Sequence, residues 1–134
     1  AGYLRLIPSE VVHRYRRRIL NIHPAPLPSF GGKGMYGMRV HQAVVDAGES
    51  MTGATVHYVD EEYDRGTIIG QSRVPVEPND SAEVVAARVL EIEHRLYPLA
   101  AEHVCSALIE GRDPGPLELP ELSSTETTDL EHTE

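Results

Sequence analysis

The chain has 134 residues, of which 40% are hydrophobic and 25% charged, so its length fits one domain with its own core. The 12 Lys and Arg against 21 Asp and Glu give a net charge of −9, which argues against a nucleic-acid backbone as the main ligand. The single cysteine, Cys105, excludes an internal disulfide, and we expect a buried, inert thiol in a helix. We also predict no membrane span, because no apolar run approaches the roughly 20 residues that one needs.

The first half of the chain predicts two strands and two helices. Tyr3–Ile7 is typical of a buried strand, and Ser9 can cap a short helix that ends near Arg16. Ile19–His23 reads as a short strand that leads into a proline-rich stretch and a glycine-rich loop. The apolar spacing over residues 38–47 predicts a helix. Because the chain opens part-way into a strand and without methionine, we expect further sequence upstream.

The second half predicts two strands and a long helix. Residues 54–59 and 67–76 should pair antiparallel, because so short a connection cannot make a parallel crossover. Asp80 and Glu83 resemble a capping box at the start of the helix, which Pro98 should kink or split. We expect a globular part over residues 1–111. Residues 112–134 hold seven acids against one base and predict a disordered tail.

The most informative segment for chemistry is the end of the Ile19–His23 strand. Side chains alternate along a strand, so Asn21 and His23 should share one face while Ile22 points into the core. An amide and an imidazole side by side suit a carbonyl whose oxygen becomes negative during nucleophilic attack. Asn-x-His is also a common spacing, and in the alternative interpretation Asn21 caps a turn and His23 only packs.

Asp64 precedes Arg65 and Gly66 at the tip of a strand–loop–strand unit. A carboxylate near His23 would favour the charged imidazole and orient the ring. No Ser or Cys nucleophile accompanies these residues, so direct transfer between two bound substrates fits better than a covalent intermediate. The alternative is a plain turn residue before glycine.

A metal site is the competing chemical interpretation. His23, His41, His57 and Asp64 are suitable ligand types, but no tight ligand spacing is present, and we predict no metal. The glycine-rich loop at 31–37 lacks the ending of a phosphate-binding loop, which favours a flexible flap.

The order and spacing of several short strings resemble the glycinamide ribonucleotide formyltransferases, folate-dependent enzymes of purine synthesis. The strings run from Ala1 to about Pro98. They comprise Ala1-Gly2-Tyr3-Leu4-Arg5, Asn21-Ile22-His23-Pro24, Leu27-Pro28, His41-Gln42-Ala43, Gly53-Ala54-Thr55-Val56-His57-Tyr58-Val59, Asp64-Arg65-Gly66, Ile68-Ile69, Val74-Pro75-Val76, Glu93-His94 and Tyr97-Pro98.

The resemblance implies roles for individual residues. Asn21, His23 and Asp64 match the catalytic trio: His23 as the acid–base, Asn21 as a holder of the oxyanion, and Asp64 as the group that keeps His23 protonated. Pro24 and Glu93 match contacts to the acceptor, with Glu93 on its ribose. The residues that match the slot for the pterin of 10-formyltetrahydrofolate are Leu4, Arg5, Leu6, Ile7, Val12, Ile19, Asn21, Val59, Asp60, Glu61 and Asp64.

The resemblance also implies an α/β, formyltransferase-like (Rossmann-like) fold of which only the C-terminal half is present. That half should hold a mixed sheet with an antiparallel strand pair and a long C-terminal helix. The implied ligands are small molecules, the folate co-substrate and glycinamide ribonucleotide, with no nucleic acid, membrane or metal. Exposed strand edges would favour self-association, and the pathway implies the cytoplasm. Alternatives are a non-catalytic folate-binding fragment, a hydrolase of the same folate, and transfer to another amine.

Overall fold

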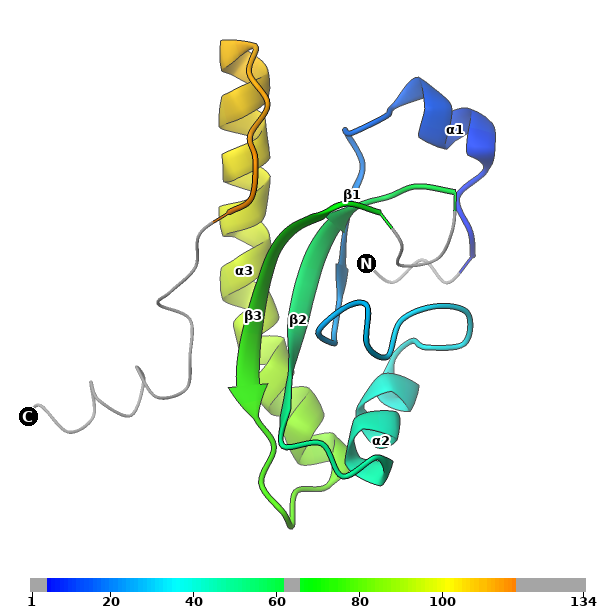
Figure 1. The fold of residues 1–134 in the computed structure, drawn as a ribbon, viewed down its shortest axis with the longest axis vertical. Coiled ribbons are helices and arrows are strands. Elements are labelled where there is room, and N and C mark those ends of the chain that lie inside the picture. Colours follow the sequence, from blue (N-terminus) through cyan, green and yellow to red (C-terminus); the bar gives the residue numbers. More distant parts are fainter. Residues whose placement is uncertain (1–4, 62–65, 118–134) are drawn as a thin grey trace, which may run out of the picture.

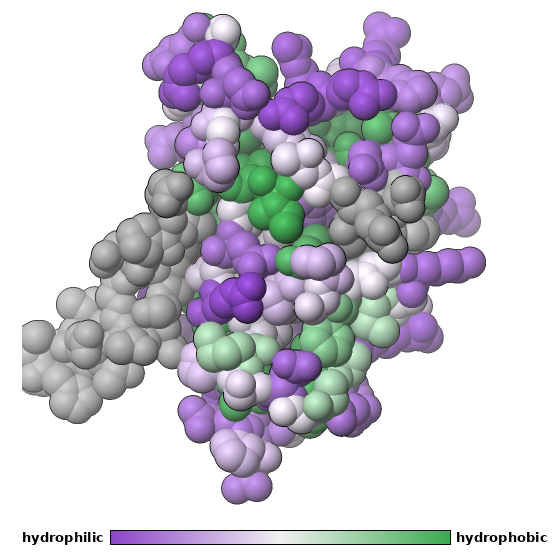
Figure 2. All heavy atoms as spheres, in the orientation of Figure 1, coloured by the Kyte–Doolittle hydropathy of each residue, from purple (hydrophilic) through white to green (hydrophobic). Residues whose placement is uncertain are grey.

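We analysed the fold in a computed structural model, which describes residues 5–61 and 66–117. The elements run in the order α1 (Ser9–Arg14), β1 (Leu20–His23), α2 (Met38–Asp46), β2 (Met51–Tyr58), β3 (Ile68–Pro75) and α3 (Ala82–Glu110). Figure 1 shows the strands lying against the long helix α3, with α2 beside the lower part of the sheet and α1 near its upper end. The face seen in Figure 2 is largely polar, with only small apolar patches.

The described strands form one sheet in the order β1-β2-β3, and both pairings are antiparallel. The expected β2–β3 pair is therefore confirmed, whereas the mixed sheet is not seen among the described strands. The expected strand Tyr3–Ile7 is wrong for residues 5–7, which are irregular; residues 3 and 4 lie outside the described part. β1 is an edge strand of the described sheet, and residues 5–7 lie across the cavity from it rather than pairing with it.

The two faces of the sheet have different surroundings. Ile22, Val56 and Tyr58 point to the face that packs against α3, where they join its apolar stripe in the core. The opposite face carries Asn21 and His23, as their alternation with Ile22 predicted. The stripe on α3 consists of Val85, Val89, Ile92, Leu96, Ala100 and Val104, at steps of three and four residues.

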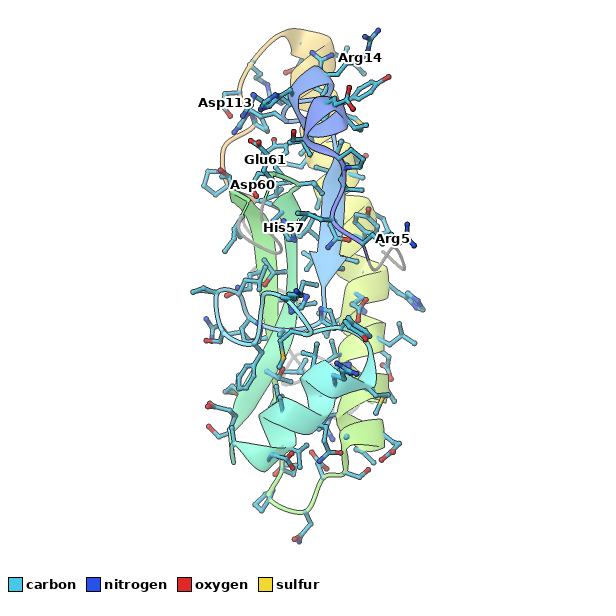
Figure 3. All side chains as sticks on the ribbon, turned by 90° about the vertical axis from the view of Figure 1, so that its right-hand side faces the viewer. Arg5, Arg14, His57, Asp60, Glu61 and Asp113 are labelled. Atoms are coloured by element: carbon cyan, nitrogen blue, oxygen red, sulfur yellow. The ribbon has the colours of Figure 1, made fainter. Side chains whose placement is uncertain are left out.

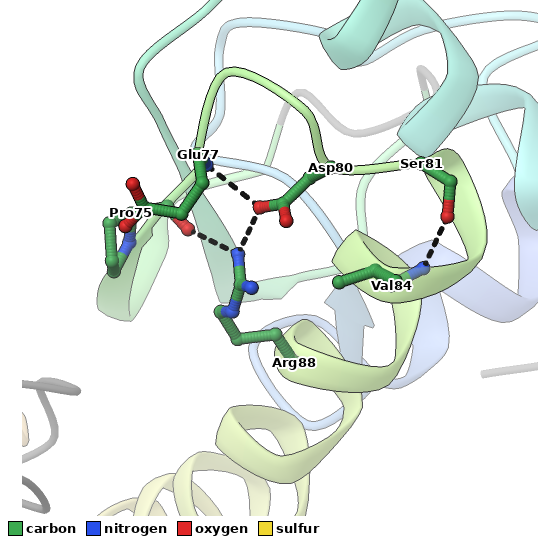
Figure 4. A network of polar contacts seen from close by, with 6 residues as sticks. All are labelled: Pro75, Glu77, Asp80, Ser81, Val84 and Arg88. Carbon is green, nitrogen blue, oxygen red and sulfur yellow. Dashed lines mark hydrogen bonds and ion pairs between the residues drawn. The ribbon is translucent and has the colours of Figure 1, made fainter.

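The caps of two helices differ from the predicted ones. Ser81, not Asp80, caps α3 by accepting a hydrogen bond from the Val84 N–H at 3.2 Å. Figure 4 shows why: the Asp80 carboxylate accepts from Arg88 and from the Glu77 N–H, both at 2.7 Å. The hydrogen bond from Arg88 also lowers the pKa of Asp80.

The short helix α1 begins at Ser9 and has Pro8 as its N-cap, with no side-chain cap bond. The Pro8 carbonyl accepts from the backbone N–H groups of Val11 and Val12, which leaves the Ser9 side chain no capping role. The helix ends at Arg14, two residues short of the predicted end.

The C-terminal region differs from the sequence expectations at several points. The expected split of α3 at Pro98 is wrong: Figure 1 draws one continuous ribbon, because the apolar stripe continues past the proline and holds both halves to the core. Cys105 is exposed, since it follows the buried Val104 and falls outside the stripe. Residues 112–117 pack back on the domain, where the Leu117 N–H donates to the Ile69 carbonyl at 2.8 Å. The rest of the expected tail, residues 118–134, lies outside the described residues.

We predict that Gly66→Ala destabilises the domain. A Cβ at residue 66 would lie 1.6 Å from the Tyr58 carbonyl oxygen, which also accepts a hydrogen bond from His57 Nδ1. The backbone must move to relieve this overlap, and we expect a loss of about 2 kcal/mol or more in the free energy of unfolding. Denaturant titration measures it, with Gly111→Asn as the control, because residue 111 has open space and Asn tolerates its left-handed conformation. Equal stability of the two variants would contradict the prediction.

Candidate active site

A cavity of about 910 Å³ follows strand β1 along its whole length. Consecutive residues 19–24 line it, so it runs along the edge of β1 that is not paired with β2. Residues 5–7 and 59–60 contribute one part of the wall, and residues 32–39 contribute another. Ala86, Leu90 and Glu93 of α3 complete it. The cavity therefore brings together segments that are far apart in the sequence, around the predicted Asn21 and His23.

Asn21 is held by a histidine on the neighbouring strand. The register pairs Asn21 with His57, and the Asn21 amide nitrogen lies 3.5 Å from His57 Nε2. His57 Nδ1 lies 2.8 Å from the Tyr58 carbonyl oxygen, an acceptor only, so Nδ1 carries the proton and the unprotonated Nε2 accepts from Asn21. This chain of contacts fixes which way the amide faces. Figure 3 shows His57 within the sheet, on the side of Asp60 and Glu61.

His23 is tied to the start of the glycine-rich loop. Its Nε2 donates to the Phe30 carbonyl oxygen at 2.7 Å, and only 4% of the residue is exposed. Phe30 has a φ of 57°, in the left-handed region, and this unusual conformation aims its carbonyl at the imidazole. The carbonyl oxygen is an acceptor only, so Nε2 carries a proton and the ring is held in a fixed orientation.

A third histidine, His41 of α2, lines the same cavity and is only 5% exposed. Burial lowers the pKa of His41, and the charge of His23 lowers it further. His41 therefore favours its neutral form more than a free histidine does. Its Nδ1 has no hydrogen-bond partner among the described residues.

Glu93 faces the cavity from α3 in a half-buried position. Burial raises the pKa of Glu93, and the charge of His94 opposes that rise. A carboxylate that loses its hydration on folding is stabilised by any ligand group that donates a hydrogen bond to it, such as a sugar hydroxyl.

We expect Glu93→Gln to stabilise the protein at neutral pH. The folded state keeps a proton on Glu93 at pH values where the unfolded chain has lost it, so the free energy of unfolding falls as pH rises through that range. A neutral amide removes this loss. Thermal unfolding between about pH 4 and pH 8 measures it, with the exposed Glu91→Gln on the same helix as control. A melting temperature at neutral pH no higher than that of the wild type would contradict it.

The structure brings most of the predicted site residues to this one cavity. Among those lining it are Arg5, Leu6, Ile7, Ile19, Asn21, His23, Pro24, Val59, Asp60 and Glu93. Val12 is instead on the buried face of α1 and does not line the cavity. The Glu61 carboxylate lies 3.3 Å from His13 Nε2, outside the cavity wall. The predicted Leu4 and Asp64 lie outside the described residues.

Several cavity residues were not predicted as part of a catalytic or substrate site, chiefly Lys33, Tyr36, Arg39, His41 and His57. His41 and His57 were weighed only as metal ligands, and no cluster of three potential ligands exists within residues 5–61 and 66–117. Their alignment with Asn21 and His23 depends on strand register and helix packing, which local spacing does not reveal. In the same part of the chain, no helix is both long and apolar enough to cross a membrane.

The comparisons with known proteins agree with this arrangement. The family model described as formyl transferase matches residues 1–101. The chain belongs to the formyl transferase family. The resemblance seen in the sequence is thereby confirmed, and the family assignment covers all of the described cavity residues.

Relatives of this formyl transferase chain are considerably longer. It is 52% identical over 115 residues to the chloroplastic phosphoribosylglycinamide formyltransferase of Arabidopsis thaliana, covering 86% of this chain and 39% of that protein. The solved phosphoribosylglycinamide formyltransferase of Brucella melitensis is 50% identical with a TM-score of 0.66, over 75% of this chain and 49% of that one. A formyltetrahydrofolate deformylase from Pseudomonas syringae is 30% identical with a TM-score of 0.68, over 78% and 34%. The chain thus spans half or less of these relatives.

Proposed function

We propose that this chain supplies the folate-side wall and catalytic groups for transfer of a formyl group from 10-formyltetrahydrofolate to the amine of glycinamide ribonucleotide. One observation carries the proposal: Asn21 and His23 lie on one face of β1, each held by a partner, in a cavity large enough for two small molecules. The curated relative with 52% identity bears the name of this activity.

The chemistry follows from the groups present. The acceptor amine attacks the formyl carbon, a carbon–nitrogen bond forms, and the carbonyl electron pair moves onto oxygen. The Asn21 amide and the His23 imidazolium donate hydrogen bonds to that oxygen, which carries more charge in the transition state than in the substrate. The intermediate collapses as the bond from the formyl carbon to folate N10 breaks, and N10 receives the proton that the amine releases.

In this proposal Asp64 keeps His23 protonated and relays the amine proton. It lies outside the described residues, but the described end of its loop lies against β2, the strand that pairs with β1, since Gly66 approaches the carbonyl of Tyr58, the register partner of Leu20. The proposed folate wall is apolar at Leu6, Ile7 and Val59 and has backbone groups at its edge, as a flat heterocycle requires. Pro24 and Glu93 are proposed to face the acceptor.

A formyl-transfer assay tests the proposal, with glycinamide ribonucleotide as acceptor, on this chain and on one extended upstream toward the length of its relatives. We expect folate-dependent product from the extended chain. Product from neither chain, with folate binding retained, would support the alternative of a non-catalytic folate-binding fragment.

Hydrolysis of the same folate is the second candidate, because the Pseudomonas syringae neighbour is named a formyltetrahydrofolate deformylase. The assay separates the two reactions when the acceptor is omitted. A transferase then releases little formate, whereas a hydrolase releases it at an undiminished rate. Transfer to a different amine would appear as product only with that other acceptor.

The remaining ligands and the location follow from the proposed reaction. We propose small-molecule substrates with no metal, nucleic acid or membrane partner, and self-association along the uncovered edge of β1, which sedimentation would reveal. A cytoplasmic location is proposed from the pathway. The Arabidopsis relative is named chloroplastic, so fractionation of cells that produce the longer protein is the test.

A further inference from the structure

Three residues of the sheet form a row that leads away from the cavity. The strand registers pair His23 of β1 with Thr55 of β2, and Thr55 with Gln71 of β3. Residues directly opposite one another in an antiparallel sheet share a face, so all three side chains lie on the face turned away from α3. Of the three, only His23 lines the cavity. Any influence of Thr55 or Gln71 on the reaction must therefore pass through other residues.

The Thr55 hydroxyl makes as many hydrogen bonds as a hydroxyl can. It is completely buried and donates to the Ala25 carbonyl at 2.8 Å. It also accepts from the Leu27 N–H at 3.1 Å and from Gln71 Nε2 at 2.9 Å. Gln71 Nε2 uses its second hydrogen to donate to the Leu27 carbonyl at 2.9 Å, while Arg73 donates to Gln71 Oε1 at 3.1 Å. The two side chains thereby hold the backbone that follows β1 at three points.

The segment held in this way, residues 25–27, lies in the middle of the connection that orients the His23 imidazole. The connection leaves β1 at His23 and returns to the same side chain, because His23 Nε2 donates to the Phe30 carbonyl at 2.7 Å. Three of its residues are prolines, which have no N–H to donate, so bonds from side chains contribute much of what fixes its course. A shift of residues 25–27 would carry the Phe30 carbonyl with it.

We propose that Thr55 and Gln71 are positioning residues for His23: by holding residues 25–27, they place the Phe30 carbonyl that orients the imidazole. This inference rests on the proposed function for the part that His23 plays in the reaction. A structural role alone predicts a loss of stability and nothing else. A positioning role predicts that the hydrogen bond of His23 loosens while the rest of the site stays intact, and that the rate of the chemical step falls.

Proton exchange measured by NMR tests the positioning without any turnover. The Nε2–H of His23 is buried and bound to Phe30, so we expect its signal to exchange slowly with water in the wild type. Gln71→Met keeps the length of the side chain and removes both donated bonds, and it should accelerate this exchange about tenfold or more. The Nδ1–H of His57, which is buried and makes no bond to Gln71, is the internal control. His23→Ala identifies the His23 signal by its disappearance.

Threonine variants of β2 supply a matched pair. Thr55→Val removes the bound hydroxyl and should accelerate the exchange of the His23 proton, whereas Thr55→Ser keeps the hydroxyl and should exchange as the wild type does. Thr52→Val is the control, because the Thr52 hydroxyl is equally buried but has no hydrogen-bond partner among the described residues. Should Thr55→Val fail to fold, Gln71→Met at its half-buried position carries the same test.

Two results of the exchange experiment would overturn the proposal. One is a His23 proton that exchanges equally fast in the wild type and in Gln71→Met. The other is an equal acceleration of the His57 proton, because the variant would then have loosened the whole sheet rather than one side chain.

Formyl-transfer kinetics then connect the positioning to the reaction. Gln71→Met should lower kcat about tenfold and leave the KM values of both substrates within about twofold, and Thr52→Val should match the wild type. An unchanged kcat in Gln71→Met overturns the proposal. A wild type that transfers no formyl group, together with accelerated exchange at His23 in Gln71→Met, would sink the proposed function and leave the positioning of His23 standing.

Discussion

His23→Ala should reduce the kcat of formyl transfer by about 10²- to 10⁴-fold, the range typical of losing a positioned acid–base group. The imidazole is buried in the cavity wall, and the hydrogen bond from its Nε2 to the Phe30 carbonyl fixes the orientation of the ring. Alanine removes both the hydrogen bond to the developing oxyanion and the proton donor. Single-turnover measurements of formyl transfer at saturating folate report the loss directly.

Folate binding is the control for this variant. Of the residues proposed for the pterin slot that line the cavity, only Ile19 and Asn21 lie within four residues of His23. We therefore expect the Kd for a folate analogue to stay within about twofold, a difference below 0.5 kcal/mol. Turnover that survives His23→Ala would remove His23 from the mechanism, and loss of folate binding together with turnover would point to a collapsed cavity instead.

Asn21→Leu should lower kcat by about 10²- to 10³-fold, because it removes one hydrogen-bond donor to the oxyanion while keeping the shape of the side chain. The KM values should change little, since that donor acts mainly in the transition state. His57→Phe should lower kcat in the same direction by a smaller factor, about tenfold. It leaves the Asn21 amide in place but removes the nitrogen that orients it.

The double variant Asn21→Leu/His57→Phe tests whether His57 acts through Asn21. If His57 acts through Asn21, then His57→Phe has no further effect on kcat once Asn21 is leucine. Independent, multiplicative effects would show that His57 does not position Asn21. Because His57 is buried, thermal unfolding of each variant is measured in parallel, and His57→Asn keeps a polar side chain should the phenylalanine variant fail to fold.

Local sequence patterns predicted those elements that depend on local forces. The core-facing residues Ala54, Val56 and Tyr58 of β2 and the apolar stripe of α3 both follow from local spacing. So does the stop of α3 at Gly111, which takes a φ of 70°. The strand expected at residues 5–7 was wrong because a strand forms only by pairing with another strand, and local sequence patterns do not reveal such long-range pairing. Ser81 caps α3 in place of the predicted Asp80, because the Asp80 carboxylate accepts a hydrogen bond from Arg88, two turns further along the helix.

In the site, too, local patterns predicted some residues and long-range packing determined the others. Asn21 and His23 were predicted because two residues of one strand share a face wherever the strand lies. The contact of Asn21 with His57 depends on the register between β1 and β2, a long-range choice. Lys33, Arg39 and His41 reach the cavity through the packing of α2 and its preceding loop, which composition alone describes only as flexible and helical.

The bond from His23 to Phe30 also joins the catalytic strand to the loop that precedes α2. Only two residues separate Phe30 from Lys33, which lines the cavity, so the imidazole and this part of the cavity wall are held by the same short stretch of backbone. A substitution that moves the loop backbone would therefore also turn the His23 ring, although it lies outside the strand.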